Sequence, residues 1–164
     1  MRQRSWAGVM LACLVSFVVA CGSGSSPGGS AASPPAASCA GVKGAHHAWI
    51  VVQHLSGAVV QKCVGFEADT EPGIDLMKAA GIEYQTQHFS FGDAMCQVDN
   101  EPAQFTQCLP ANAPYWAMFV FSGSAWTVPD TGISGVSFHD KDALGWRYTQ
   151  PDASPAPPPA PPRA

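Results

Sequence analysis

Residues 39–150 alternate short apolar runs with turn residues, which is the pattern of a β-rich domain. The run His47–Leu55 is rich in Trp, Ile and Val and predicts a strand. The following Ser56-Gly57 predicts a turn, and residues 58–66 then predict the hairpin partner of that strand.

A single segment has a convincing helical pattern. Thr70 is the expected helix N-cap, with Glu71 and Pro72 in the first turn, and Gly81 is expected just beyond the helix end at Ala80. One side of this helix is apolar and is expected to pack on a sheet; it carries Leu76, Met77 and Ala80.

The rest of the domain predicts short strands. Residues 88–91 and 94–98 lie on either side of a Gly-Asp turn, and Tyr115–Phe121 is apolar on both faces, as in a central strand. Further strands are expected at 126–128, 136–138 and 144–148. The predicted fold class is therefore α+β: a small β-rich domain with one short helix packed on a mixed or antiparallel sheet.

The start of the chain has the pattern of a lipoprotein signal peptide over residues 1–20. After Arg2 and Arg4, the 15 residues Trp6–Ala20 carry no charge, which is too few to span a bilayer but typical of the apolar part of a signal peptide. The segment ends in Val18-Val19-Ala20-Cys21, which resembles a bacterial lipobox. We therefore expect cleavage before Cys21 and lipidation of its thiol, which predicts a membrane-anchored protein on the extracytoplasmic side of the cell envelope.

Low-complexity segments flank the domain. Residues 21–38 combine the lipidated cysteine with a linker of only Gly, Ser, Ala and Pro, which predicts a flexible tether. Residues 151–164 contain seven prolines and predict an extended, disordered tail.

Cysteine usage supports export. Of six cysteines, Cys13 lies in the signal peptide and Cys21 is the lipidation site, so four remain: Cys39, Cys63, Cys96 and Cys108. An even number in an exported domain favours disulfides, and of the three possible pairings we favour the two that join cysteines nearer in sequence, 39 with 63 and 96 with 108. A zinc site is the weaker alternative, because no Cys-x2-Cys pair is present.

Composition and motifs argue against several functions. The net charge of −4 and eight basic residues argue against nucleic-acid binding. No nucleophile elbow, metalloprotease helix or phosphate-binding loop occurs, so we expect no enzyme and no cofactor. The five histidines are scattered, and the adjacent His46 and His47 would point to opposite faces of a strand. Asp140 and Asp142 are expected to form a turn rather than to hold a metal.

Aromatic side chains are the candidate ligand contacts. Trp126 follows Ser122-Gly123-Ser124-Ala125 and is the one expected to be most exposed, on a mobile loop. Tyr115 should face away from Trp116 by strand alternation. The predicted ligand-binding residues are Trp126 and Tyr115, with Trp146 as third choice, although Trp116 and Trp146 also fit core positions in apolar strands.

The order of these segments resembles the transcobalamin-like C-terminal domain, a small β-domain of vertebrate cobalamin carriers that also occurs in bacterial surface proteins. The matching motifs are Ile74–Gly81, Cys96–Asp99, Tyr115-Trp116, Gly132–Ser134, His139–Asp142 and Leu144–Tyr148. The match departs from the family at Asn100, near an expected turn glycine, and at Lys141, where the family often has glycine between two turn acids.

The resemblance implies a binding module that captures a corrinoid or another small molecule as an accessory to uptake. The vertebrate carriers hold cobalamin between this domain and a helical barrel, which this chain lacks, so half of that kind of site is missing. The alternative is a structural or interaction module of the envelope that binds a partner protein and no small molecule. Exposed aromatics beside a cleft favour the first function, and a flat polar surface favours the second.

Overall fold

A computed structural model of the chain describes residues 37–162. The predicted signal peptide, the lipidation site Cys21 and most of the linker lie outside the described residues, as do positions 163 and 164. Within the described part, no helix is both long and apolar enough to cross a membrane.

A five-stranded sheet forms the centre of the domain. Its strands, in spatial order, are β2 (Val59–Phe66), β1 (His46–Gln53), β9 (Ala143–Thr149), β6 (Tyr115–Ser122) and β7 (Ala125–Thr127). Strands β1 and β9 are parallel and the other neighbours are antiparallel, so the sheet is mixed.

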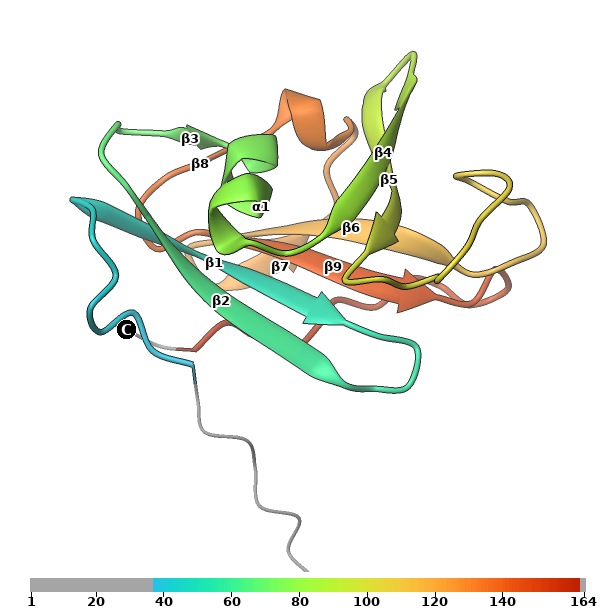
Figure 1. Ribbon diagram of the computed structural model, residues 1–164, viewed down its shortest axis with the longest axis horizontal. Helices are drawn as coiled ribbons and strands as arrows, with labels where there is room; N and C mark the ends of the chain where they lie inside the picture. The colour runs from blue at the N-terminus through green and yellow to red at the C-terminus, as the bar shows by residue number, and fades with distance from the viewer. Residues whose placement is uncertain (1–36, 163–164) are drawn as a thin grey trace, which may run out of the picture. The chain divides into compact units, whose positions relative to one another are not determined.

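The remaining elements cover one face of this sheet, which we call the inner face (Figure 1). They are α1 (Gly73–Ala80), the hairpin of β4 (Tyr84–Phe89) and β5 (Gly92–Val98), the short pair β3 (Glu71–Pro72) and β8 (Ser137–Phe138), and the single turn η1 (Ile133–Gly135). The predicted fold class, a small α+β domain with one short helix and a mixed sheet, is confirmed.

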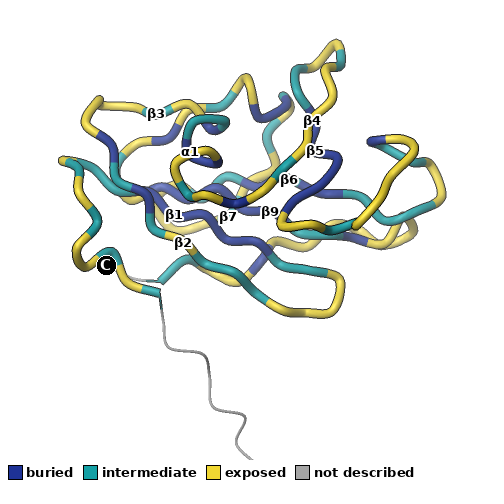
Figure 2. Tube along the Cα trace, in the orientation of Figure 1, coloured by how far each residue is buried: buried dark blue, intermediate teal, exposed yellow. Residues whose placement is uncertain are grey.

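The main core lies between the inner face and α1. Leu76 and Met77 of the helix are fully buried, and Ala80 packs at the edge of the same cluster. Trp116 and Trp146 contribute large apolar surfaces from the sheet, with 4% and 2% of their area exposed. Figure 2 shows this buried layer running along the central strands beneath the helix.

The predicted helix start is wrong. The helix begins at Gly73 with Pro72 as N-cap, so Thr70 does not cap it. The reason is tertiary: Glu71 and Pro72 pair with Phe138 and Ser137 as β3 and β8, which holds the expected first turn in an extended conformation. The predicted end is confirmed, because Gly81 adopts a left-handed φ of 64° and its N–H donates to the Lys78 carbonyl.

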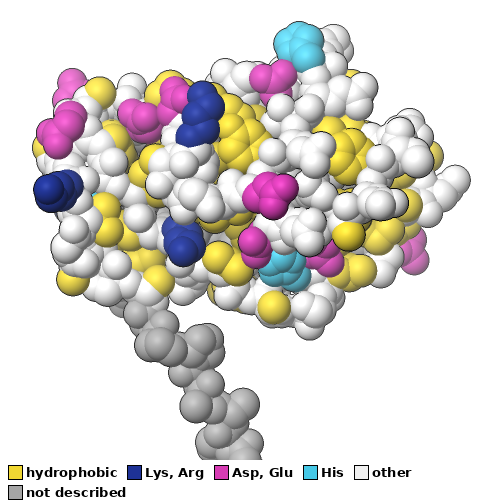
Figure 3. Space-filling view, viewed as in Figure 1, with side chains coloured by type: hydrophobic (Ala, Val, Ile, Leu, Met, Phe, Trp, Pro, Cys, Tyr) yellow, Lys and Arg dark blue, Asp and Glu magenta, His cyan; other side chains and the backbone are white. Residues whose placement is uncertain are grey.

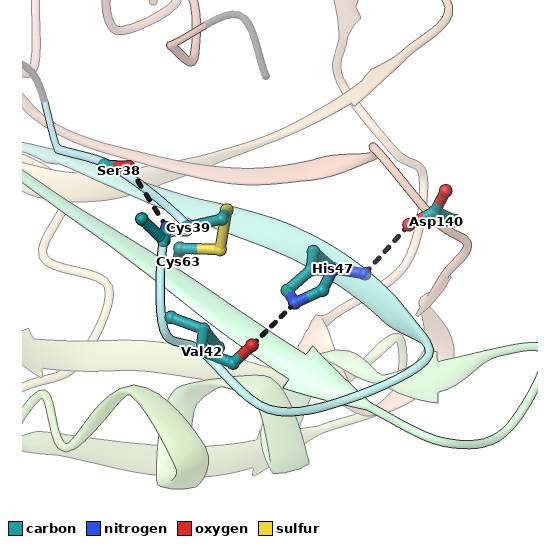
Figure 4. The surroundings of a disulfide bond; sticks show 7 residues. Ser38, Cys39, Val42, His47, Cys63 and Asp140 are labelled. Carbon is teal, nitrogen blue, oxygen red and sulfur yellow. Dashed lines mark hydrogen bonds between the residues drawn. A yellow bond between two sulfur atoms is a disulfide. The ribbon is translucent and has the colours of Figure 1, made fainter.

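Both favoured disulfides form. Cys39 joins Cys63 and Cys96 joins Cys108, with Cα–Cα distances of 5.3 and 4.4 Å. The first bond fastens the segment before β1 to β2 (Figure 4). In the same view His47 Nε2 lies 3.1 Å from the Val42 carbonyl, and the His47 N–H donates to Asp140 Oδ1 at 2.8 Å. Two disulfides are typical of an oxidising, extracytoplasmic compartment.

The described part of the C-terminal tail contacts the sheet. Residues 151–162 form no helix or strand, as their composition predicts, but they lie on the outer face rather than extending freely. Pro158 is buried against Gly145 of β9. The missing side chain makes room for it, because a Cβ at Gly145 would lie 2.9 Å from the Pro158 ring and 2.6 Å from the Trp126 ring. Composition alone could not reveal this contact, since it depends on a notch that the folded sheet creates.

Candidate functional site

Two of the three predicted ligand residues lie at one pocket. Tyr115 and Trp146 both line a cavity of about 250 Å³ beside β6, whereas Trp126 lies elsewhere. The expected alternation at the start of β6 is confirmed, because Trp116 belongs to the inner core and Tyr115 is only half-buried.

This pocket, called the β6 pocket below, forms where β6 lacks a strand neighbour. Strand β7 pairs only with Val120, Phe121 and Ser122, so residues 115–119 have no partner strand on that side within the described chain. The gap is bounded by β5 and by the segment 128–133. The lining is mainly apolar and consists of Phe91, Asp93, Ala94, Met95, Leu109, Tyr115, Trp116, Ala117, Met118, Val128, Pro129, Thr131, Gly132, Ile133, Trp146 and Pro155.

The rim of the β6 pocket contains exposed apolar side chains. Val128 is 65% exposed and Phe91 is 44% exposed. Phe91 stacks on Phe89 with ring centroids 5.4 Å apart. The Phe91 carbonyl accepts hydrogen bonds from Thr131 Oγ1 at 2.9 Å and the Gly132 N–H at 2.8 Å, so the rim is held in place. An ordered apolar rim is suited to contact with an apolar ligand.

A buried donor in the lining is unsatisfied. Trp146 is 2% exposed, and its Nε1 has no hydrogen-bond partner within residues 37–162. A buried indole N–H normally finds an acceptor, since leaving it unpaired costs about 1–3 kcal/mol. Because this nitrogen is itself covered, a ligand acceptor reaches it only after the lining side chains move.

Trp126 is less exposed than the sequence predicts. It lies on β7 opposite Phe121, and the two rings meet edge to face at 5.2 Å. The residue is half-buried on the outer face, because Pro158 and the bare Gly145 backbone lie against it. Its Nε1 is buried and has no partner among the described residues. Trp126 therefore contacts the C-terminal tail on the outer face of the sheet.

A carboxylate–histidine cluster escaped the sequence reasoning. His54 Nδ1 lies 2.7 Å from Glu101 Oε2, and His54 Nε2 lies 3.1 Å from Asp99 Oδ2. The imidazole can donate to both carboxylates only in its doubly protonated form. The residues are 45 to 47 positions apart, and no local motif signals the contact. The cluster ties the β1–β2 turn to the turn after β5, because the Leu55 N–H also donates to Glu101.

No described cluster is suited to a metal ion. Within residues 37–162, no group of three or more His, Cys, Asp or Glu side chains is arranged to hold one. His46 lies 5.6 Å from the Phe66 ring, whereas His47 faces Val42 on the other side of the strand. The turn role of Asp142 is confirmed, because its Oδ2 accepts the His139 N–H at 2.8 Å.

Few charged side chains lie near the β6 pocket or near Trp126. Figure 3 shows acidic, basic and histidine side chains scattered over one face, with apolar side chains between them. Burial, with a smaller effect from the negative charge of Glu101, raises the pKa of Tyr148. A hydrogen bond from Nζ to Asp75 Oδ1, at 2.8 Å, raises the pKa of Lys78. Asp93 is the one acidic residue in the lining of the β6 pocket, and most of the other lining residues are apolar.

Comparisons with known proteins found likeness only among solved structures. No family model and no curated protein matches the chain. Among solved structures, "a putative metal binding protein from Ruminococcus gnavus" is similar over 64% of this chain and 97% of its own, with 13% sequence identity and a TM-score of 0.48.

Proposed function

We propose that this chain is a lipid-anchored, extracytoplasmic binding module with a transcobalamin-like domain, and that its β6 pocket captures a small molecule. The lipobox-like Val18-Val19-Ala20-Cys21 supports the anchor, and the Gly/Ser/Pro linker supports a tethered domain. The ordered motifs from Ile74 to Tyr148 support the family resemblance.

The apolar β6 pocket, lined by Tyr115 and by Trp146 with its unpaired indole N–H, carries the proposal of ligand capture. The β6 pocket combines apolar walls with one buried donor and the half-buried Tyr115. Binding sites for small molecules commonly have this composition, in which a few polar groups orient a ligand held by apolar contact. The polar side chains of the lining are Asp93, Tyr115 and Thr131, and the Thr131 hydroxyl is engaged by the Phe91 carbonyl; the activity we propose is binding.

The pocket volume defines the ligand class. At about 250 Å³ the cavity is slightly smaller than the roughly 300–1,000 Å³ of typical ligand sites. A small, mainly apolar molecule with one acceptor group fits inside. A corrinoid is larger than the cavity, so only one edge could enter while the rest lay on the rim of Phe91 and Val128. Because the pocket is open to solvent at its rim, a ligand is only partly enclosed. We therefore expect a Kd near the micromolar range, equivalent to about −8 kcal/mol.

The test is ligand binding to the mature chain and two matched variants. The apolar dye 1-anilinonaphthalene-8-sulfonate and cyanocobalamin serve as probes, measured by fluorescence and equilibrium dialysis respectively. We expect binding of at least one probe to weaken about tenfold in Trp146→Phe, which removes the unsatisfied donor, equivalent to about 1.4 kcal/mol. The matched variant Trp126→Phe, on the outer face, should bind as the parent does.

Thermal unfolding of both variants separates binding from folding, because Trp146→Phe also removes buried volume. Equal binding by the parent and by a folded Trp146→Phe, or binding of neither probe, would contradict small-molecule capture at this pocket.

A second candidate function is protein binding in the envelope. The outer face of the sheet supports it, because this face is apolar and already holds an extended segment of the chain.

A further inference from the structure

The outer face of the sheet is nearly as apolar as its inner face. Trp49, Val51 and Phe119 point away from the helix, and they are 4%, 0% and 2% exposed. A sheet whose second face meets water normally carries polar residues there. Buried apolar side chains on this face indicate a covering layer, and the tail lies over the neighbouring Gly145 and Arg147.

The tail crosses this face lengthwise above β9. Arg147 Nη1 donates to the carbonyls of Ala156 and Pro157, at 3.3 Å each. Pro158 then fills the notch over Gly145 beside Trp126. We call this surface the outer groove, formed by Trp49, Phe119, Phe121, Trp126, Gly145 and Arg147.

Two features show that the tail fits the outer groove incompletely. Trp126 Nε1 remains buried without an acceptor even though Pro158 packs on its ring. Beyond Pro158, a hollow of about 710 Å³ separates the segment 160–162 from Trp49 and Phe121. The hollow and the buried Trp126 nitrogen are separate places, and a segment that replaced the tail would gain contacts at the hollow and would reach the nitrogen only once Pro158 is displaced.

We infer that the outer groove is a docking site for an extended proline-rich segment of another protein, and that the chain's own tail competes for it. Polyproline II segments bind aromatic grooves because their shape is preformed and their carbonyls face outward as acceptors. The outer groove supplies the matching parts: aromatic walls, an indole donor and the guanidinium of Arg147. This inference rests on the second candidate function and concerns a surface other than the β6 pocket, although Pro155 of the tail also lines that pocket.

The experiment uses an oligoproline peptide and two single variants of the mature chain. Pro158→Ser removes the buried proline and loosens the tail, whereas Pro159→Ser alters an adjacent exposed proline. When the tail occupies the outer groove, only the fraction of molecules with a free groove can bind a peptide, and the apparent affinity falls in proportion. We therefore expect Pro158→Ser to bind oligoproline about fivefold tighter than Pro159→Ser. A Gly-Ser peptide of equal length is the control ligand and should not bind.

The indole N–H resonances in a nitrogen–proton NMR spectrum report the site directly, with Trp126 assigned from Trp126→Phe. Oligoproline should shift the Trp126 indole signal downfield, as expected for an N–H that gains an acceptor, and should leave Trp146 unchanged. Equal affinities for the two proline variants, or an unmoved Trp126 signal with peptide at about 1 mM, would overturn the inference. A dimer formed by tail exchange in Pro158→Ser would also overturn it, since the occupant would then be a second copy. Failure here leaves the β6 pocket untouched, because dye binding there is measured separately.

Discussion

Lys141 shows how one residue adapts to a turn that favours glycine. It adopts a φ of 70°, in the left-handed region, between Asp140 and Asp142. Its N–H donates to the His47 carbonyl at 2.7 Å, which fixes this conformation against β1. The resemblance identified this position as one where the family often has glycine, and the backbone angle gives the physical reason. Asn100, the other departure, likewise has a φ of 61°.

Replacing Lys141 with glycine should therefore stabilise the domain. The left-handed conformation costs a non-glycine residue about 1–2 kcal/mol, and glycine loses about 0.5–1 kcal/mol more backbone entropy on folding. The net expectation for Lys141→Gly is a gain of about 0.5–1 kcal/mol in the free energy of unfolding, measured in urea. Lys141→Ala keeps the strain and is the matched control; an equal gain in both variants would show that the side chain, not φ, is responsible.

Tyr148 gives the domain a pH dependence in the alkaline range. Its pKa in the folded state is raised above the usual value of 10.0, mainly by burial, and its ring lies 4.9 Å from that of Trp116. Below about pH 10 both states are protonated, whereas at higher pH the unfolded chain loses this proton first. The free energy of unfolding should therefore fall as the pH rises through about 10 and beyond. Urea unfolding of Tyr148→Phe at about pH 9 and about pH 11 should show a shallower fall than the parent; parallel falls would exclude Tyr148 as the cause.

Among the elements, the β1–β2 turn and the turn after β5 depend on the His54 cluster. The His54 side chain is 15% exposed and bridges Glu101 and Asp99. The backbone carbonyl of Glu101 also accepts a hydrogen bond from Trp116 Nε1–H at 2.7 Å. Loss of the imidazole would leave two carboxylates facing each other without their common donor.

His54→Ala should lower the free energy of unfolding by about 1–3 kcal/mol, because hydrogen bonds to charged groups are lost at a mostly buried position. The matched variant is His88→Ala, whose side chain is 81% exposed although it lies 2.8 Å from Asp93. Exposed pairs contribute at most about 1 kcal/mol, so His88→Ala should change little. Equal losses in the two variants would show that the bridge between the turns adds nothing.

Sequence patterns predicted where helices and strands occur better than they predicted where these elements end or which elements they contact. The apolar runs at His47–Leu55 and Tyr115–Phe121 form strands because strand pattern is a local property. The helix start was wrong because Glu71 and Pro72 pair with residues more than 60 positions away. The β6 pocket depends on β7 being too short to cover the edge of β6, which alternation of residues does not reveal. Two aromatics of the pocket were predicted from type alone, whereas the Trp126 environment required knowledge of where the tail lies.

At the scale of the whole molecule, the two sides of the sheet serve different roles. The inner side carries the helix and the β4–β5 hairpin (Figure 1). The pocket proposed for a small ligand lies at the open edge of β6, between the two sides. The outer side carries the Cys39–Cys63 disulfide and the proline-rich tail. Trp146→Phe tests the β6 pocket with the tail in place, whereas Pro158→Ser acts first on the outer groove and also on Pro155, which lines the pocket.

The proposed attachment to a membrane concerns the whole molecule, and it would rest on one thiol. The proposed lipid on Cys21 would anchor a domain that the linker of residues 22–38 holds roughly 20–25 Å away, from the scaling of flexible chains.

Cys21→Ser should abolish acylation and move the protein from the detergent phase to the aqueous phase on phase separation. Cys13→Ser, in the segment that cleavage removes, is the matched control and should stay in the detergent phase. The mature parent should also carry the mass of a diacylglycerol on its first residue. Unchanged partitioning of Cys21→Ser would rule out this anchor, while the two disulfides would continue to place the domain in an oxidising compartment.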